Sequence, residues 1–200
     1  MPAAWLHVMQ RVFYQGSNAV LYSIFGLIVD TVTGILGALF LLRFWMQAVR
    51  VRPPMSFAHF MFQATDWLVK PLRRLLPGVG GYDWASMIGA LLMIMVSVAL
   101  DLFIAASVTP QALVVLSLLR LVQWMLYGLM GLLLIEVIFS WVNPHAPLAP
   151  LVRAMNEPIM RPLRRVIPLM GGIDLSPIVA FLLLRIALSV SSALLLPLAF

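Results

Sequence analysis

The chain contains no cysteine among its 200 residues. This absence excludes disulfide bonds, thiolate metal sites and c-type haem attachment within the chain. Charged residues are also scarce, at 10% of the sequence, whereas a soluble domain carries about 25%. With 63% hydrophobic residues, the protein has too few polar groups to cover its surface in water. The composition therefore predicts an integral membrane protein.

The sequence also lacks the motifs of common enzyme chemistry. It has no P-loop, no Gly-rich dinucleotide turn, no G-x-S-x-G and no H-E-x-x-H pattern. Its three histidines, His7, His59 and His145, are scattered along the chain at spacings that suggest no metal site. We therefore expect a protein that is not an enzyme, holds no cofactor or metal, and makes no contact with nucleic acid.

Four stretches of the chain are apolar and long enough to span a bilayer, which takes roughly 20 residues. They run from about Leu21 or Leu27 to Val49, from Trp84 to Val108, from about Leu113 to Val142 and from about Leu175 to Phe200. Residues 1–20 have apolar positions at helical spacing but no apolar core of a signal peptide. We predict a short interfacial helix there, followed by an all-α fold of four transmembrane helices.

One block of the sequence occurs twice. Pro-Leu-Arg-Arg-Leu-Leu-Pro at 71–77 returns as Pro-Leu-Arg-Arg-Val-Ile-Pro at 162–168, and Gly-Gly-x-Asp at 80–83 returns at 171–174, both at an offset of 91 residues. A repeat of this length predicts two structural units. We therefore divide the chain into an N-terminal interfacial segment, 1–20, a first half, 21–108, and a second half, 109–200, with two spans in each half.

Basic residues concentrate in two of the three loops between the spans. The first loop carries Arg50, Arg52, Lys70, Arg73 and Arg74, the third carries Arg153, Arg161, Arg164 and Arg165, and the loop near 107–111 carries none. The positive-inside bias predicts that both basic loops are cytoplasmic and that both termini face outward. The two halves then have the same orientation in the membrane, as parallel repeats.

Both basic loops also show apolar residues at helical spacing opposite a charged face. They are too charged to span, so we predict cytoplasmic amphipathic segments. Pro71, Pro158 and Pro162 remove backbone donors, and we expect a break with a new short helix at or near Pro71 and Pro162. Asp83 and Asp174 precede the second and fourth spans, where we expect helix N-caps, with ligand binding as the alternative.

The basic blocks form the first candidate site. It comprises Arg73, Arg74, Arg164 and Arg165, together with Lys70 and Arg161. One interpretation is retention of these loops on the cytoplasmic side, helped by anionic lipid. The other is a specific site for a lipid headgroup or an acidic partner. Basic residues that serve topology alone are the commoner case, whereas repetition of the whole block favours the specific site.

Charges inside the spans form the second candidate site, because such residues are costly in lipid and usually pair within the protein. They are Asp30, Arg43, Asp101, Arg120, Glu136 and Arg185. Depth along the spans predicts a pair of Asp101 with Arg120 toward the outer side and a pair of Glu136 with Arg185 toward the inner side. Arg43 is an alternative partner, or it snorkels to the interface. The pairs could fix helix register or form part of an ion path.

Several motifs resemble the YggT family of small bacterial membrane proteins. They are Leu-Leu-Arg-Phe-Trp-Met-Gln at 41–47, the two Pro-Leu-Arg-Arg blocks, Ser-Trp at 140–141 and Gly-Gly-Ile-Asp-Leu-Ser-Pro at 171–177. The resemblance extends from about Leu21 to the C-terminus, and it implies an inner-membrane protein of two related halves. It also implies links to osmotic-stress tolerance, cell division or envelope organisation, and, in plastid relatives, cytochrome assembly and nucleoid distribution.

Two functions are therefore expected. The first is a non-catalytic envelope, assembly or stress-tolerance factor that engages anionic lipid or a partner through its paired basic loops. The alternative is an ion transporter or channel component that uses the intramembrane charges. A four-span monomer offers little room for a pore, which favours the first function. The expected partners are membrane lipids, a membrane or cytoplasmic protein, or further copies of the chain.

Overall fold

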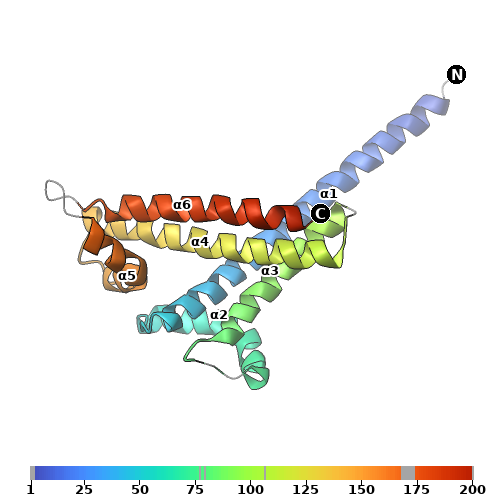
Figure 1. Cartoon of the computed structure of the whole chain (residues 1–200). Helices are drawn as coiled ribbons and strands as arrows, with labels where there is room; N and C mark the ends of the chain where they lie inside the picture. The colour runs from blue at the N-terminus through green and yellow to red at the C-terminus, as the bar shows by residue number, and fades with distance from the viewer. Residues whose placement is uncertain (1–2, 77, 79, 106, 168–173, 200) are drawn as a thin grey trace.

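The structure, a computed structural model, describes the backbone of residues 3–76, 78, 80–105, 107–167 and 174–199, and the side chains from Val20 onward. Six α-helices follow one another in the described part of the chain (Figure 1). They are α1 (Ala3–Ala48), α2 (Met55–Leu75), α3 (Trp84–Ile104), α4 (Pro110–Val142), α5 (Ala149–Val166) and α6 (Ser176–Leu195), and a 3-10 turn, η1 (Leu196–Leu198), follows α6. No strand occurs among these residues, so the all-α prediction is confirmed.

Four of the helical stretches are long and apolar enough to cross a membrane. They are Val20–Ala48, Trp84–Ile104, Pro110–Val142 and Ser176–Leu198. The four spans predicted from the sequence are thus confirmed, with bounds that differ by a few residues. The second span ends at Ile104 and not at Val108. Helix α4 begins at Pro110, before the predicted Leu113, because the Thr109 side chain accepts a hydrogen bond from the backbone N–H of Ala112 and caps the helix.

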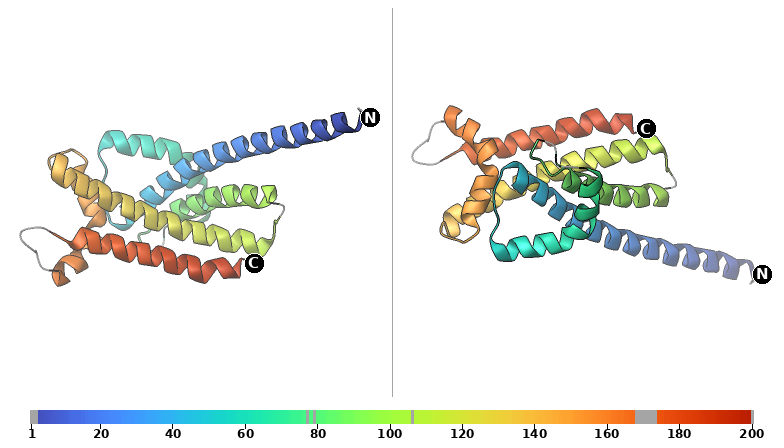
Figure 2. Two further views of the ribbon diagram at one scale, coloured as in Figure 1. Left: turned by 90° about the horizontal axis from the view of Figure 1, so that it is seen from above. Right: turned by 90° about the horizontal axis from the view of Figure 1, so that it is seen from below.

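Helix α1 continues without a break from Ala3 into the first span. The segment contains no proline that would end the helix. Residues 3–20 are therefore the first turns of the same helix, and their placement at the membrane interface stays a prediction. In Figures 1 and 2 this N-terminal part of α1 extends away from the other helices, while α4 and α6 lie side by side.

Helices α2 and α5 lie at the same end of the bundle, where α1 and α4 end and α3 and α6 begin. Met46 of α1, Met61 of α2 and Met155 of α5 form one buried cluster. The indole N–H of Trp45 donates a 3.0 Å hydrogen bond to the backbone oxygen of Met155 and so joins the two halves there. We refer to this end, formed by α2, α5 and the linker 49–54, as the basic end.

The expected helix breaks at the prolines are wrong. Pro71 lies inside a continuous α2, and Pro158 and Pro162 lie inside a continuous α5. All three proline rings are exposed. The carbonyl four residues before each proline loses its donor, but it lies on the same exposed helix face and can be hydrated. Hydration of this kind lets both helices continue.

Each half buries a core of its own. In the first half, Phe40 is fully buried against α3, where a Cβ on Gly89 would lie 3.1 Å from the Phe40 ring. The absence of a side chain at Gly89 thus allows α1 and α3 to pack closely. In the second half, Met160 of α5 and Ala180 of α6 are fully buried and belong to one cluster with α4.

Candidate functional site

The doubled block builds the same ion pair in both halves. Arg73, in the last turn of α2, donates to Asp83 from Nε at 3.2 Å and from Nη2 at 2.5 Å. Arg164, in the last turn of α5, donates from Nε to Asp174 at 2.9 Å. Each pair ties a basic-end helix to the start of the next span. The side chain of Asp83 is only 2% exposed, whereas that of Asp174 is 32% exposed.

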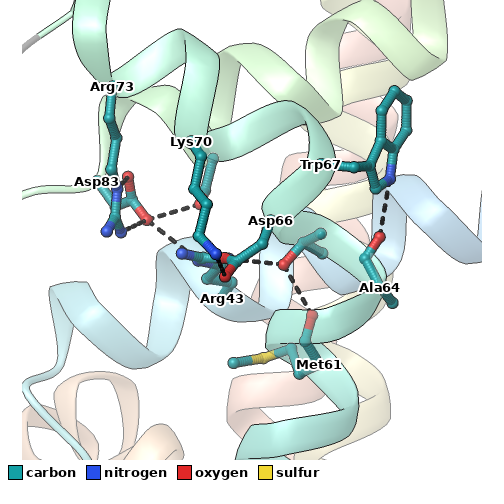
Figure 3. A network of polar contacts seen from close by, with 10 residues as sticks. Arg43, Met61, Ala64, Asp66, Trp67, Lys70, Arg73 and Asp83 are labelled. Atoms are coloured by element: carbon teal, nitrogen blue, oxygen red, sulfur yellow. Dashed lines mark hydrogen bonds and ion pairs between the residues drawn. The ribbon is translucent and has the colours of Figure 1, made fainter.

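A buried arginine extends this arrangement in the first half (Figure 3). Arg43 of α1 is 5% exposed. Its Nη1 donates to Thr65 Oγ1 and to Asp66 Oδ1, both at 2.7 Å, and its Nε lies 3.4 Å from Asp83 Oδ2. The guanidinium also stacks 4.7 Å from the ring centre of Phe62. Arg43 therefore neither snorkels to the interface nor pairs with Glu136, which corrects both expectations.

The carboxylates of this first network are held in their ionised form. Burial opposes ionisation of Asp83, but hydrogen bonds from Arg73 and Ser86 outweigh it and lower the pKa of Asp83 below its usual value. The hydrogen bond to Asp83 in turn raises the pKa of Arg73. The pKa of Asp66 is also lowered, because hydrogen bonds from Arg43 and Lys70 outweigh its burial. Lys70 Nζ lies 3.0 Å from Asp66 Oδ2.

The second half places a glutamate where the first half has an arginine. Glu136 of α4 accepts a 2.7 Å hydrogen bond from Asn156 Nδ2 on α5, and its other oxygen lies 3.3 Å from Arg164 Nη2. The predicted pairing of Glu136 with Arg185 is wrong. Arg185 lies on the exposed side of α6 and forms no ion pair with a described residue, because α6 turns a different face, which includes Ala180, toward α4 and α5.

One further carboxylate, Glu157, completes the second network. Glu157 Oε1 lies 3.5 Å from Nε of Arg161, which follows it by one helical turn. Glu157 Oε2 lies 3.8 Å from Arg164 Nη1. Burial alone would lower the pKa of Arg164. The hydrogen bond to Asp174 and the charge of Glu136 outweigh burial, so the pKa of Arg164 is raised above its usual value. Lys70 and Arg161, predicted as ligand-binding residues, are each engaged with a carboxylate on their own helix.

Of the two predicted helix caps, Asp174 accepts a hydrogen bond from the first backbone N–H of its helix and Asp83 does not. Asp174 Oδ1 accepts a 2.9 Å hydrogen bond from the backbone N–H of Ser176, which opens α6. This bond and Arg164 outweigh the burial of Asp174 and lower its pKa. Asp83 stands at the N-cap position of α3, but its carboxylate caps no backbone amide. Its side chain binds Arg73 and the Ser86 hydroxyl, at 2.7 Å, because a charged donor is the stronger partner.

A third cluster lies within the spans, toward the opposite end from α2 and α5. Arg120 Nη2 lies 2.8 Å from Asp101 Oδ2, so the predicted pair does form. Nη1 donates to Ser97 Oγ at 2.6 Å and lies 3.7 Å from Asp30 Oδ1. Ser97 also donates to Asp30. Pairing by depth alone missed Asp30, although it lies at nearly the same distance from the basic end as Asp101.

The ion pairs sort the cations of the chain into two groups. All seven carboxylates take part in ion pairs. The guanidinium groups without an ion pair to any described residue are those of Arg50, Arg52, Arg74, Arg153, Arg165 and Arg185. All of these except Arg185 lie at the basic end. Of the predicted binding residues, only Arg74 and Arg165 are therefore free to engage a ligand.

No group of three or more histidine, aspartate or glutamate side chains that could hold a metal ion occurs in the described part of the chain. The polar clusters are instead alternating sets of arginine and carboxylate. They position helices against one another and leave free guanidinium groups at one end of the molecule.

Known proteins match the chain over most of its length. The family model described as CCB3/YggT matches residues 22–104 and 115–195, one stretch in each half. An uncharacterized protein of Pseudomonas aeruginosa is 37% identical over 160 residues, covering 76% of this chain and 81% of the relative. The YggT protein of Escherichia coli K12, also uncharacterized, is 32% identical over 160 residues, covering 80% and 84%. No solved structure matches. With four helices able to cross a membrane, the chain belongs to the CCB3/YggT family.

Proposed function

We propose that the protein is a non-catalytic, multi-pass inner-membrane protein whose basic end faces the cytoplasm and engages an anionic surface, either lipid headgroups or an acidic partner. The observation that carries this proposal is the sorting of its charges. Every carboxylate is already paired, whereas five arginines at the basic end are not. Each arginine near an anionic membrane surface contributes roughly 1 kcal/mol.

The two halves have matched parts in this function. Arg74 and Arg165 follow the ion-paired Arg73 and Arg164 directly in the chain. Of each doubled arginine, the first thus fixes the end of an amphipathic helix to the next span, and the second is left for an external anion. An envelope or assembly role fits a molecule that presents unpaired basic side chains at one end.

Lipid selectivity tests the proposal. The protein is reconstituted in phosphatidylcholine vesicles with a trace of spin-labelled phosphatidylglycerol or phosphatidylcholine, and the motionally restricted fraction is measured. The wild type should favour phosphatidylglycerol. Replacing the five free arginines (Arg50, Arg52, Arg74, Arg153 and Arg165) with Gln should remove that preference.

Lys70→Gln with Arg161→Gln is the matched control. These residues are also cationic and exposed on α2 and α5, but each is paired with a carboxylate. The control should keep most of the preference. A wild type that does not distinguish the two lipids excludes a lipid surface. Pull-down of an acidic protein by the wild type and not by the variant would then support the partner.

The alternative function is ion transport, and the cluster around Arg120 favours it. Two carboxylates, Asp30 and Asp101, share this one cation within the spans, and their side chains are 50% and 44% exposed. Flux of potassium, sodium or protons in reconstituted vesicles tests this function. Flux that is lost in Asp30→Asn would support transport, and absence of flux in folded protein would exclude it.

A further inference from the structure

A deep apolar groove runs between the two halves. One wall is α1, with Gly34, Ala38 and Trp45, and the other wall is α4, with Trp124 and Gly128. The groove has a volume of about 610 Å³ and no charged residue in its lining. A Cβ built on Gly128 would meet no atom within 4 Å, so the space above this wall is open.

The length of the groove matches one leaflet of a bilayer. Its lining spans twelve residues on α1, from Gly34 to Trp45, and twelve on α4, from Trp124 to Ile135. Eleven steps of 1.5 Å make each wall about 16 Å long. The hydrocarbon core is about 30 Å thick, so one leaflet is about 15 Å deep. The groove is thus the right length for a single acyl chain.

Aromatic side chains mark both ends of the groove. At the deep end, the Trp124 ring fills the position beside Gly37, where a Cβ would lie 2.5 Å from it. At the basic end stands Trp45, whose indole N–H is bonded to Met155 of α5. The groove is therefore closed toward the middle of the membrane by Trp124.

Free arginines from both halves lie just beyond Trp45. Arg50 and Arg52 belong to the linker that follows α1. In this linker, Val49 and Val51 border a small surface hollow together with Ala154, Glu157 and Arg161 of α5, so the linker passes beside the helix that carries Arg153. The chain thus brings three arginines that form no ion pair with a described residue to the end of the groove where the headgroup of a bound lipid would lie.

We propose that this groove binds one acyl chain of an anionic glycerophospholipid, with the phosphate at Arg50, Arg52 and Arg153. The proposal rests on the proposed function in taking anionic lipid as the ligand of the basic end, and it adds a defined site. Because one wall and part of the cation set come from each half, the bound lipid bridges the two halves.

The charges beside the groove favour a lipid over a helix of a second copy as its occupant. The lining is apolar along about 16 Å, and unpaired arginines follow α1 at its basic end. An acyl chain with an anionic headgroup satisfies both features, whereas an apolar helix satisfies only the first.

Quenching by brominated lipid tests the site. Phosphatidylglycerol brominated on its acyl chains is titrated at low mole fraction into phosphatidylcholine vesicles that contain the protein, and tryptophan fluorescence is recorded. A chain in the groove lies beside Trp124 and Trp45 and should give a saturable component. Brominated phosphatidylcholine should need a much higher mole fraction, because three arginines favour the anionic lipid by about fivefold each.

Filling the groove should remove the saturable component. Gly128→Leu with Gly131→Leu places side chains into open space, since a Cβ at either position meets nothing within 4 Å. The matched control is Ala187→Leu, on an exposed position of α6 outside the groove. The control should quench like the wild type. Arg50→Gln with Arg153→Gln should weaken the component by about fivefold per arginine.

Three results would overturn the site: a saturable component that survives in the filled variant, equal quenching by the two lipids, or a wild type whose groove is covered by a cross-linkable second copy. The spin-label measurement separates this failure from that of the proposed function. Loss of the groove component with retained preference for phosphatidylglycerol removes the groove alone. Loss of both also excludes lipid as the ligand of the basic end in the proposed function and leaves only an acidic partner.

Discussion

The two halves place opposite charges against corresponding residues of α2 and α5. In the first half, Arg43 of α1 contacts Thr65 of α2. In the second half, Glu136 of α4 contacts Asn156 of α5, and residues 65 and 156 are separated by the same 91 residues as the doubled block. Around each contact, the bridge between arginine and aspartate is the same. What differs is the sign of the charge that the first span contributes.

This exchange gives the two networks opposite surplus charge. The first holds three cations, Arg43, Lys70 and Arg73, against two carboxylates. The second holds two cations, Arg161 and Arg164, against three carboxylates. Both networks lie at the basic end. The ion pair of the doubled block thus forms beside a cation, Arg43, in the first half and beside an anion, Glu136, in the second. We expect the burial of each central residue to determine how much stability its network loses when that residue is replaced.

The largest difference between the halves should follow removal of the central charge. Arg43→Gln leaves the buried Asp83 and the partly buried Asp66 with fewer donors and should cost about 3 kcal/mol of unfolding free energy. Glu136→Gln should cost only about 1 kcal/mol, because Arg164 keeps Asp174 and is partly hydrated. Unfolding in mixed micelles measures both. Arg74→Gln, an exposed and unpaired arginine, is the control, and equal losses for the two central variants would contradict the comparison.

The repeated bridge should differ in strength between its two copies. Asp83→Asn removes a 2% exposed carboxylate that accepts two bonds from Arg73, and should cost about 2 kcal/mol. Asp174→Asn removes a 32% exposed carboxylate and should cost less than about 1 kcal/mol. The same unfolding measurement applies. A larger loss for Asp174→Asn would mean that its cap on Ser176 outweighs burial.

Acid should weaken the first half more than the second, because two of the three carboxylates with lowered pKa values lie there. The pKa values of Asp66, Asp83 and Asp174 are lowered in the folded protein. Their stabilisation is therefore complete well above the unfolded value of about 3.9 and is lost as pH falls through the folded values. Unfolding free energy measured from pH 6 to 3 should fall less steeply in Asp83→Asn than in the wild type. Asp174→Asn should change the slope less, and a steeper fall in Asp83→Asn would oppose this account.

The smallest effects should come from the pairs within single helices. Lys70 pairs with Asp66 on α2, and Arg161 pairs with Glu157 on α5, each one turn apart and each with an exposed cation. Such pairs contribute about 0.5 kcal/mol or less. Lys70→Ala and Arg161→Ala should therefore have small and similar effects, which should shrink further in 0.5 M salt. A loss several times larger in either variant would show that the residue holds the network and not only its own helix.

The sequence predicted the spans well and the partners of the charges poorly. Length and hydropathy are enough to find four spans, and depth along them was enough to pair Asp101 with Arg120. The same depth argument failed for Glu136 because it compared spans only. In the structure, α5 folds back against the end of α4 and brings Arg164 to Glu136 instead.

One sequence signal could have found the repeated bridge. At the 91-residue offset, Asp83 and Asp174 match, as do Arg73 and Arg164, and Asp66 corresponds to Glu157. Charges that keep their sign in both copies of a block indicate a contact that the fold uses twice. The helix breaks expected at the prolines failed for a different reason, since periodicity does not show that their rings would lie on an exposed face.

The hydrogen bond from Trp45 to the backbone of Met155 gives the molecule a natural spectroscopic reporter. An indole whose N–H is held by a carbonyl emits differently from one whose N–H is released to lipid or water. Because this bond crosses from one half to the other, the difference in emission between the wild type and Trp45→Phe reports whether the halves are docked, without any attached label.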